Sequence, residues 1–218
     1  MESENLAISW HLKRAFDGVP TLDDFELVKE PLEDLKDNEI TIETLYLSPD
    51  PYQRHFASML KPPCPMIGTS IAKVTRSRNA NYPINTLVIS NHGWIRRANI
   101  DPDKKVDFGV MNFEKIPESE FPSHYLGLYG LTGLTAYYAL IKNCKPKKGE
   151  VVFVNAASGG VGHLVGQIAK ILGCKVIGTT GTILLLVVDF RNGCLFHYHY
   201  HCTLILVLIV NFGSDCRF

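Results

Sequence analysis

The sequence lacks a surplus of charge of either sign. Its 218 residues contain 22 Lys and Arg against 22 Asp and Glu. A protein that binds nucleic acid or an acidic membrane surface usually carries a basic excess, so neither partner is expected. The N-terminal stretch MESENLAISWHLKR has no apolar run and predicts no secretory signal. The apolar runs near the C-terminus are shorter than the roughly 20 residues that a bilayer requires, so no membrane span is expected.

Paired cysteines are also missing. None of the six cysteines forms a C-x-x-C motif, and without a secretory signal a disulfide framework is not expected. The same absence argues against a structural zinc site with four cysteine ligands. We therefore expect a cytoplasmic protein with reduced thiols. The cysteines are Cys64, Cys144, Cys174, Cys194, Cys202 and Cys216.

The N-terminal part, residues 1–122, is predicted to be mostly β-structure. Thr41–Leu47 alternates apolar and polar residues and is rich in β-branched and aromatic side chains, as a half-buried strand requires. Residues 67–77 and 85–94 are similar, and proline and glycine lie densely between these segments. The charged stretch 29–39 is predicted to be a solvated loop.

An α/β pattern follows. Gly130–Cys144 has apolar residues at helical spacing, and Val151–Asn155 is a short apolar run typical of a parallel strand buried on both faces. Residues 161–173 predict an amphipathic helix, with Gly173 suited to a left-handed C-terminal cap. Residues 174–180 predict the next buried strand. This order predicts a βαβ unit with a right-handed crossover.

The turn between the first strand and the helix, NAASGGVGHL, carries a glycine pattern. Ala157, Gly159 and Gly162 have the G-x-G-x-x-G spacing, with alanine in the first position. Such a turn lets backbone N–H groups approach a pyrophosphate, and a helix that starts near Gly160 points its positive end at that charge. The position between a buried strand and an amphipathic helix favours dinucleotide binding over a turn that serves packing alone.

The end of the second strand bears on which dinucleotide would bind. NAD enzymes usually carry Asp or Glu there to bind the ribose hydroxyls. Here the strand ends in Thr179 and Thr180, with no acidic residue. Threonine hydroxyls could hydrogen-bond a 2′-phosphate, which favours NADP over NAD. The alternative is that the threonines only suit a strand end.

Five colinear segments carry a family resemblance. They are DFEL (Asp24–Leu27), LYLSPDPYQR (Leu45–Arg54), MIGTSIAKV (Met66–Val74), GLTAY (Gly133–Tyr137) and VNAASGGVGHLVGQIAKILGCKVIGTTG (Val154–Gly181). The sequence resembles the prostaglandin reductases, or NADP-dependent alkenal/one oxidoreductases, a zinc-independent branch of the medium-chain dehydrogenase/reductase superfamily. The resemblance implies an α/β fold with a β-rich part. It places a GroES-like barrel domain at 1–122 and an incomplete Rossmann doubly wound NADP-binding domain at 123–181.

The resemblance also implies an activity. This is the NADPH-dependent reduction of the carbon–carbon double bond of α,β-unsaturated ketones and aldehydes, with NADP(H) as cofactor and a small enone or enal as partner. A quinone oxidoreductase of the same superfamily and a non-catalytic product stay open as alternatives. Zinc-dependent relatives carry Gly-His-Glu near the position of Gly68–Ser70. This chain has Gly-Thr-Ser there, so no metal is expected.

Site residues follow from the same resemblance, position by position. Tyr52 would lie near the nicotinamide and the substrate, or alternatively would be an aromatic anchor for its turn. Thr135 would approach the nicotinamide from the helix that contains it, or alternatively would serve only the packing of that helix. The residues that would meet the pyrophosphate are Ala156, Ala157, Ser158 and Gly159.

Residues 182–218 depart from the family pattern. They contain no Lys, Glu or Ala, and Leu185 stands where the family has a lysine that binds the 2′-phosphate. We interpret them as a divergent tail, not native to the fold, in a chain truncated relative to the family. Little or no reductase activity is expected from the isolated chain. The family commonly forms homodimers through a sheet edge that this sequence lacks.

Overall fold

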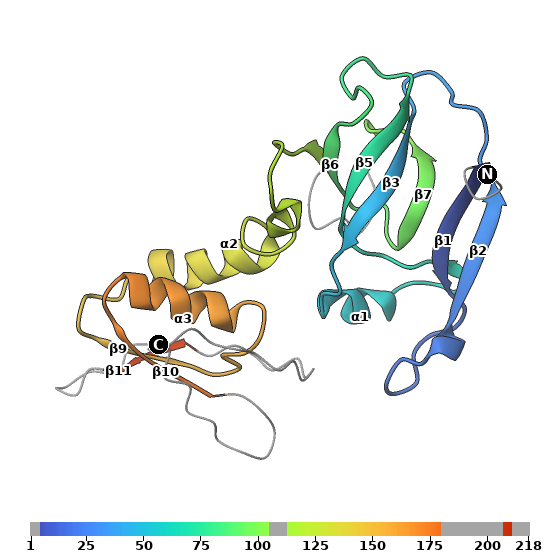
Figure 1. Cartoon of the computed structure of the whole chain (residues 1–218). Helices are drawn as coiled ribbons and strands as arrows, with labels where there is room; N and C mark the ends of the chain where they lie inside the picture. The colour runs from blue at the N-terminus through green and yellow to red at the C-terminus, as the bar shows by residue number, and fades with distance from the viewer. Residues whose placement is uncertain (1–4, 105–112, 180–206, 211–218) are drawn as a thin grey trace. The chain divides into compact units, whose positions relative to one another are not determined.

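The computed structural model describes residues 5–104, 113–179 and 207–210. The chain divides into two units, Met1–Leu126 and Gly127–Phe218 (Figure 1). The predicted limits of 1–122, 123–181 and 182–218 stay a prediction. Within the three described ranges, no helix has both the length and the apolar composition that crossing a membrane requires.

An antiparallel sheet dominates the first unit. Its strands lie in the order β2-β1-β7-β3-β5-β6-β8, and β4 pairs with β1. Three short helical segments accompany the sheet: η2 (Leu22–Asp24), α1 (Tyr52–Ala57) and η3 (Pro122–Tyr125). The strands are β1 (Leu6–Leu12), β2 (Phe25–Pro31), β3 (Ile40–Leu47), β4 (Cys64–Pro65), β5 (Ser70–Ser77), β6 (Leu87–Ser90), β7 (Ile95–Ile100) and β8 (Glu114–Lys115).

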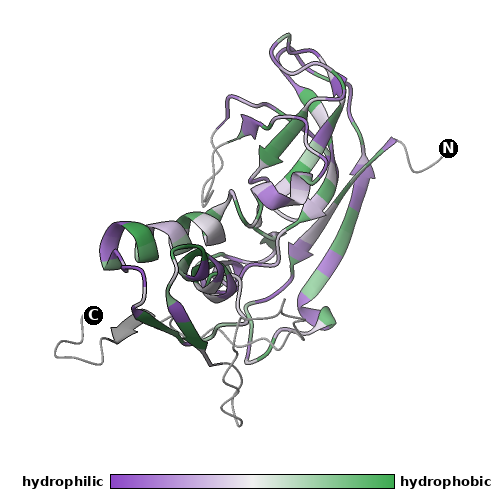
Figure 2. Cartoon of the chain, turned by 60° about the vertical axis from the view of Figure 1, so that its left-hand side comes forward, coloured by the Kyte–Doolittle hydropathy of each residue, from purple (hydrophilic) through white to green (hydrophobic). Residues whose placement is uncertain are grey.

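The core of this sheet uses alternate residues at the start of β3, Ile40 and Ile42, whereas the apolar end of β3, residues 45–47, is exposed. Strand β3 confirms the strand predicted for 41–47, and hydrophobic and hydrophilic residues alternate along the strands (Figure 2). β3 pairs with β5, with register shifts at Thr41/Ile42 and Thr44/Tyr46. One buried cluster contains Ile40, Ile42, Ala72, Val74, Val88 and Ile100.

Several predicted boundaries of the first unit were wrong. The strand predicted for 67–77 begins only at Ser70, and 85–94 contains the shorter β6. The loop predicted for 29–39 begins inside β2, which continues to Pro31. Tyr52, expected in a turn, is the first residue of helix α1. Pro51 precedes it with φ of −59°, because the proline ring is already set for a helix start.

The second unit contains the predicted βαβ arrangement. Helix α2 (Leu131–Tyr137) continues as a π-helix, η4 (Tyr138–Cys144), which together cover the predicted helix. Strand β9 (Val151–Val154) and strand β10 (Lys175–Gly178) pair in parallel, as predicted. Helix α3 (Gly162–Ile171) connects them.

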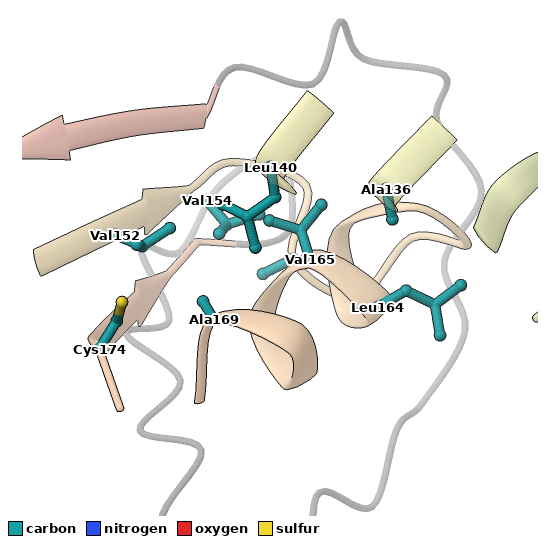
Figure 3. Packing of buried hydrophobic residues seen from close by; sticks show 9 residues of the cluster. Ala136, Leu140, Val152, Val154, Leu164, Val165, Ala169 and Cys174 are labelled. Atoms are coloured by element: carbon teal, nitrogen blue, oxygen red, sulfur yellow. The ribbon is translucent and has the colours of Figure 1, made fainter. Parts of the chain in front are cut away.

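A buried cluster joins these elements (Figure 3). Val152 and Val154 of β9 contribute side chains with no exposed area, as does Val165 of α3. The remaining members are Ala136, Leu140, Ala157, Leu164, Ala169 and Cys174. The cluster therefore packs α3 and the α2–η4 helix against the sheet, and holds the turn before α3 in place.

The end of α3 follows the prediction for Gly173. This residue has a φ of +79°, the left-handed conformation that glycine adopts without strain. The Gly173 amide donates to the Lys170 carbonyl at 2.9 Å, and the Cys174 amide donates to the Ala169 carbonyl at 3.0 Å. These two bonds form a Schellman motif, so the chain leaves the helix directly into β10.

One strand of the tail also pairs with this sheet. Strand β11 (Val207–Val210) lies antiparallel beside β9, with Val207 opposite Val154 and Val210 opposite Val151. The described part of the sheet therefore has the order β10-β9-β11. An antiparallel strand stands on the edge of β9 where a doubly wound sheet would continue in parallel.

Candidate functional site

The glycine-containing turn between β9 and α3 is held at both ends by backbone hydrogen bonds. The Gly159 amide donates to the Ala156 carbonyl at 2.9 Å. The Ala157 amide donates to the Thr179 carbonyl at 2.9 Å, and the Thr179 amide donates to the Val154 carbonyl at 2.9 Å. The turn is therefore fastened to the end of β10, and Thr179 acts there through its backbone.

Ala156 bends the chain at the start of this turn. Its φ is +49°, a left-handed conformation that is costly for a residue with a Cβ. Ala157, in the first position of the glycine pattern, is fully buried. The strained position is therefore one residue before the position that the motif assigns to its first glycine.

Among the three glycines of this turn, Gly162 is the one that the packing requires most clearly. A Cβ at this position would lie 2.3 Å from the Ala156 carbonyl oxygen and 3.0 Å from the Ala157 Cα. Both are backbone atoms, which cannot turn away as a side chain can. At Gly160 a Cβ would meet the Thr132 side chain, with Cγ2 at 3.2 Å and Cβ at 3.9 Å. The absence of a side chain at 162 thus lets the turn lie directly on the first turn of α3.

The N-terminus of α3 gives this turn its electrostatic character. The helix begins at Gly162, two residues later than predicted, because the chain needs the extra residues to complete the turn. His163 lies in the first helical turn, and its Nδ1 and its amide both donate to the Gly159 carbonyl, at 2.9 and 3.1 Å. The partial positive charge of a helix N-terminus favours an anion before it. A side chain at Gly162 would disrupt this turn. The binding of a pyrophosphate here stays a prediction.

The other residues predicted for the cofactor lie in different surroundings. Thr135 is exposed, and its hydroxyl donates to the Leu131 carbonyl at 2.7 Å within its own helix. Ser158 and Thr179 are half-buried. Thr180 and Leu185 lie outside the described residues. The cofactor roles of all these residues stay predictions.

Tyr52 lies in the first unit, at the start of α1. Its hydroxyl is 2.9 Å from the Thr69 hydroxyl, which donates to Asn91 Oδ1 at 2.9 Å. Thr69 and Asn91 are buried. Burial raises the pKa of the Tyr52 phenol, while its hydrogen bonds to Thr69 and Gln53 act in the opposite direction. Tyr52 is therefore a neutral phenol near pH 7.

A second group of side chains supports the same helix. The Trp94 indole donates to Gln53 Oε1 at 3.1 Å, and the Gln53 amide group donates to the Ser48 carbonyl. Gly68 makes room for this contact, because a Cβ there would lie 2.8 Å from the Trp94 Cδ1. No motif in the sequence pointed to Thr69, Asn91 or Gln53 as site residues. The nearest signal was the Gly68-Thr69-Ser70 segment, which indicated only that the zinc ligands of related enzymes are missing.

Metal ligands are not assembled in the described part of the chain. Among residues 5–104, 113–179 and 207–210, no group of three or more His, Cys, Asp and Glu side chains could hold a metal ion.

Several known proteins are similar to this chain. Residues 9–107 match a family model described as the N-terminal domain of oxidoreductase. Prostaglandin reductase 1 of Bos taurus is 43% identical over 183 residues, which cover 81% of this chain and 52% of that protein. The 2-alkenal reductase (NADP(+)-dependent) of Nicotiana tabacum is 38% identical, over 78% of this chain and 51% of its own length.

A solved structure has a similar backbone. CurA from Vibrio vulnificus in complex with NADPH is 32% identical, with a TM-score of 0.68, and the match covers 81% of this chain and 52% of that one. The chain spans about half the length of the curated relatives it matches.

Proposed function

Since the chain belongs to the family of prostaglandin reductase 1 and the NADP-dependent alkenal reductases, we propose that it binds NADPH as part of an enone reductase. The reaction class is the reduction of the carbon–carbon double bond of an α,β-unsaturated ketone or aldehyde. The observation that supports this best is the turn at Ala156–Gly162, which backbone hydrogen bonds hold directly before the N-terminus of α3.

The chain's own residues have separable tasks in this proposal. The turn before α3 holds the pyrophosphate of NADPH, and the dipole of α3 stabilises its negative charge. Bound NADPH would supply the hydride. Tyr52, kept neutral by burial, offers a polar contact to the substrate without placing a negative charge beside it.

The choice between NADPH and NADH tests the cofactor part of the proposal. No acidic residue follows β10 to repel a 2′-phosphate, but Leu185 stands where the family has its phosphate-binding lysine. We expect this chain to bind NADPH weakly, with little preference over NADH. Leu185→Lys should tighten NADPH binding by about tenfold, the effect of roughly 1.4 kcal/mol from a charge-assisted contact, and leave NADH binding unchanged.

Isothermal titration calorimetry with both cofactors measures this difference. Leu184→Lys is the matched control, since it adds the same charge one residue earlier. A specific 2′-phosphate contact at position 185 would be contradicted if Leu185→Lys raised the affinity for NADH as much as that for NADPH. It would also be contradicted if both variants raised the NADPH affinity equally.

Turnover tests the reaction class. NADPH oxidation is followed at 340 nm with an α,β-unsaturated ketone and with a quinone. We expect low turnover because of Leu185, a larger rate with the enone, and a saturated ketone as product by mass spectrometry. Faster oxidation with the quinone would favour the quinone oxidoreductase alternative, and no binding of either cofactor would refute the proposed function.

A further inference from the structure

The directions of the hydrogen bonds around Tyr52 are determined by its neighbours. Thr69 has one hydroxyl proton, and it donates this proton to Asn91 Oδ1 at 2.9 Å. Its contact with the Tyr52 hydroxyl, at 2.9 Å, must then be one in which Thr69 accepts. The Tyr52 proton therefore points inward, toward Thr69.

Gln53 is a further neighbour of this phenol. An indole N–H can only donate, so the Trp94 contact at 3.1 Å identifies the Gln53 oxygen. The Gln53 amide group donates to the Ser48 carbonyl, and the Gln53 side chain also bonds to Tyr52. The direction of the Tyr52 proton therefore rests on Thr69 and Asn91 alone.

We propose that Thr69 and Asn91 are positioning residues that direct the Tyr52 proton inward, so that Tyr52 presents a bound ligand with an acceptor oxygen and no proton. This inference rests on the proposed function, because it takes Tyr52 to be the substrate-side phenol of the reductase. It assigns the protonation of the reduced substrate to a donor other than Tyr52. This series of hydrogen bonds ends at the Asn91 carboxamide oxygen, which accepts a hydrogen bond and has no proton to transfer.

The arrangement predicts shifts of opposite sign for two substitutions. When Tyr52 ionises, Thr69 must turn from Asn91 and donate to the phenolate. Thr69→Val removes that donor, so the pKa of Tyr52 should rise. Asn91→Leu removes the competing acceptor and releases the Thr69 proton to the phenolate, so the pKa should fall. Each shift is expected to be about half a unit to one unit, since one hydrogen bond is at stake.

A fluorinated tyrosine at position 52 of the full chain makes the titration measurable. Its lower intrinsic pKa brings ionisation into a pH range where the fold is retained, and its ¹⁹F signal reports one of the nine tyrosines. The carboxylate of Asp50, which raises the pKa of Tyr52, is the same in every variant and cancels in the comparison.

Two further variants separate positioning from packing. Thr75→Val is the matched control, because Thr75 donates to the Thr41 carbonyl at 3.3 Å and not to Tyr52. It should leave the Tyr52 titration unchanged. Thr69→Ser keeps the hydroxyl and should restore the wild-type titration. Far-UV circular dichroism confirms that each variant is folded.

The outcomes show whether the hydrogen bonds run from Tyr52 through Thr69 to Asn91, or in the opposite direction. A rise for Thr69→Val with a fall for Asn91→Leu supports the proposal. Shifts of the same sign, or shifts no larger than that of Thr75→Val, would overturn it, since the bonds would then run from Asn91 toward Tyr52. NADPH binding, measured separately in the same variants, reports on the proposed function, so the failure of one is distinguishable from the failure of the other.

Discussion

Replacing Gly162 by alanine tests how the turn before α3 is built. The added Cβ would lie 2.3 Å from the Ala156 carbonyl oxygen, whereas an ordinary carbon–oxygen contact needs about 3.3 Å. The turn or the helix must then move by about 1 Å. Overpacking of this kind costs about 1–3 kcal/mol, and the better helix propensity of alanine returns at most about 1 kcal/mol. We expect a net loss of about 1–2 kcal/mol in the free energy of unfolding.

Urea unfolding followed by far-UV circular dichroism measures this loss, because α2, η4 and α3 all belong to the second unit. Both tryptophans, Trp10 and Trp94, belong to the first unit, so their fluorescence provides an internal reference. Gly127→Ala is the control, since a Cβ there meets nothing closer than 4.0 Å. NADPH binding should weaken in Gly162→Ala by about tenfold.

The reasoning predicts a clear contrast between the two variants. Gly162→Ala should lower the urea midpoint of the circular dichroism signal and leave the fluorescence midpoint unchanged. If Gly162→Ala and Gly127→Ala unfold at the same urea concentration as the parent chain, the close approach of turn and helix does not stabilise this unit.

Two further predictions concern single residues. Ala156→Gly should raise the free energy of unfolding of the second unit by up to about 1 kcal/mol, and its urea midpoint with it, because glycine adopts the φ of +49° without the penalty of a Cβ; an unchanged or lower midpoint would show that the strain is absent. The pKa of Asp24 lies below its usual value, chiefly through the Thr21 backbone amide and then the Arg14 guanidinium. The stability that this carboxylate contributes is therefore present above the unfolded pKa of about 4 and is lost as pH falls through the lower folded pKa. The fluorescence midpoint in urea should fall at acidic pH less steeply in Asp24→Asn than in the parent chain, and equal slopes would contradict the assignment.

The local elements of the second unit were predictable from the sequence. The apolar run at β9, the helical spacing of α3 and the position of Gly173 each reflect interactions within a few residues. The start of α3 was predicted two residues too early, because a propensity pattern does not show how many residues the turn needs. Helix α1 was missed because the prolines around it were read as loop signals, although Pro51 starts the helix.

In the candidate site, too, some features were predictable from the sequence and others were not. The Gly159 and Gly162 spacing predicted a turn with accessible backbone N–H groups. The Ala157 amide, however, is bonded to the Thr179 carbonyl, which lies 22 residues further along the chain. The partners of Tyr52 were not predictable at all. Thr69 and Asn91 come from separate segments that the antiparallel sheet brings together.

By itself, the sequence determined the class of fold and the glycine-dependent turn, because these depend on residue spacing within short segments. Five colinear segments carried the family resemblance. Only the tertiary structure decided that Ala156 carries the left-handed bend, that Thr179 fastens the turn, and that the Tyr52 hydroxyl contacts Thr69. The pairing of β11 with β9 was likewise decided there. Each of these depends on atoms that are distant in the chain and meet only when the strands pair.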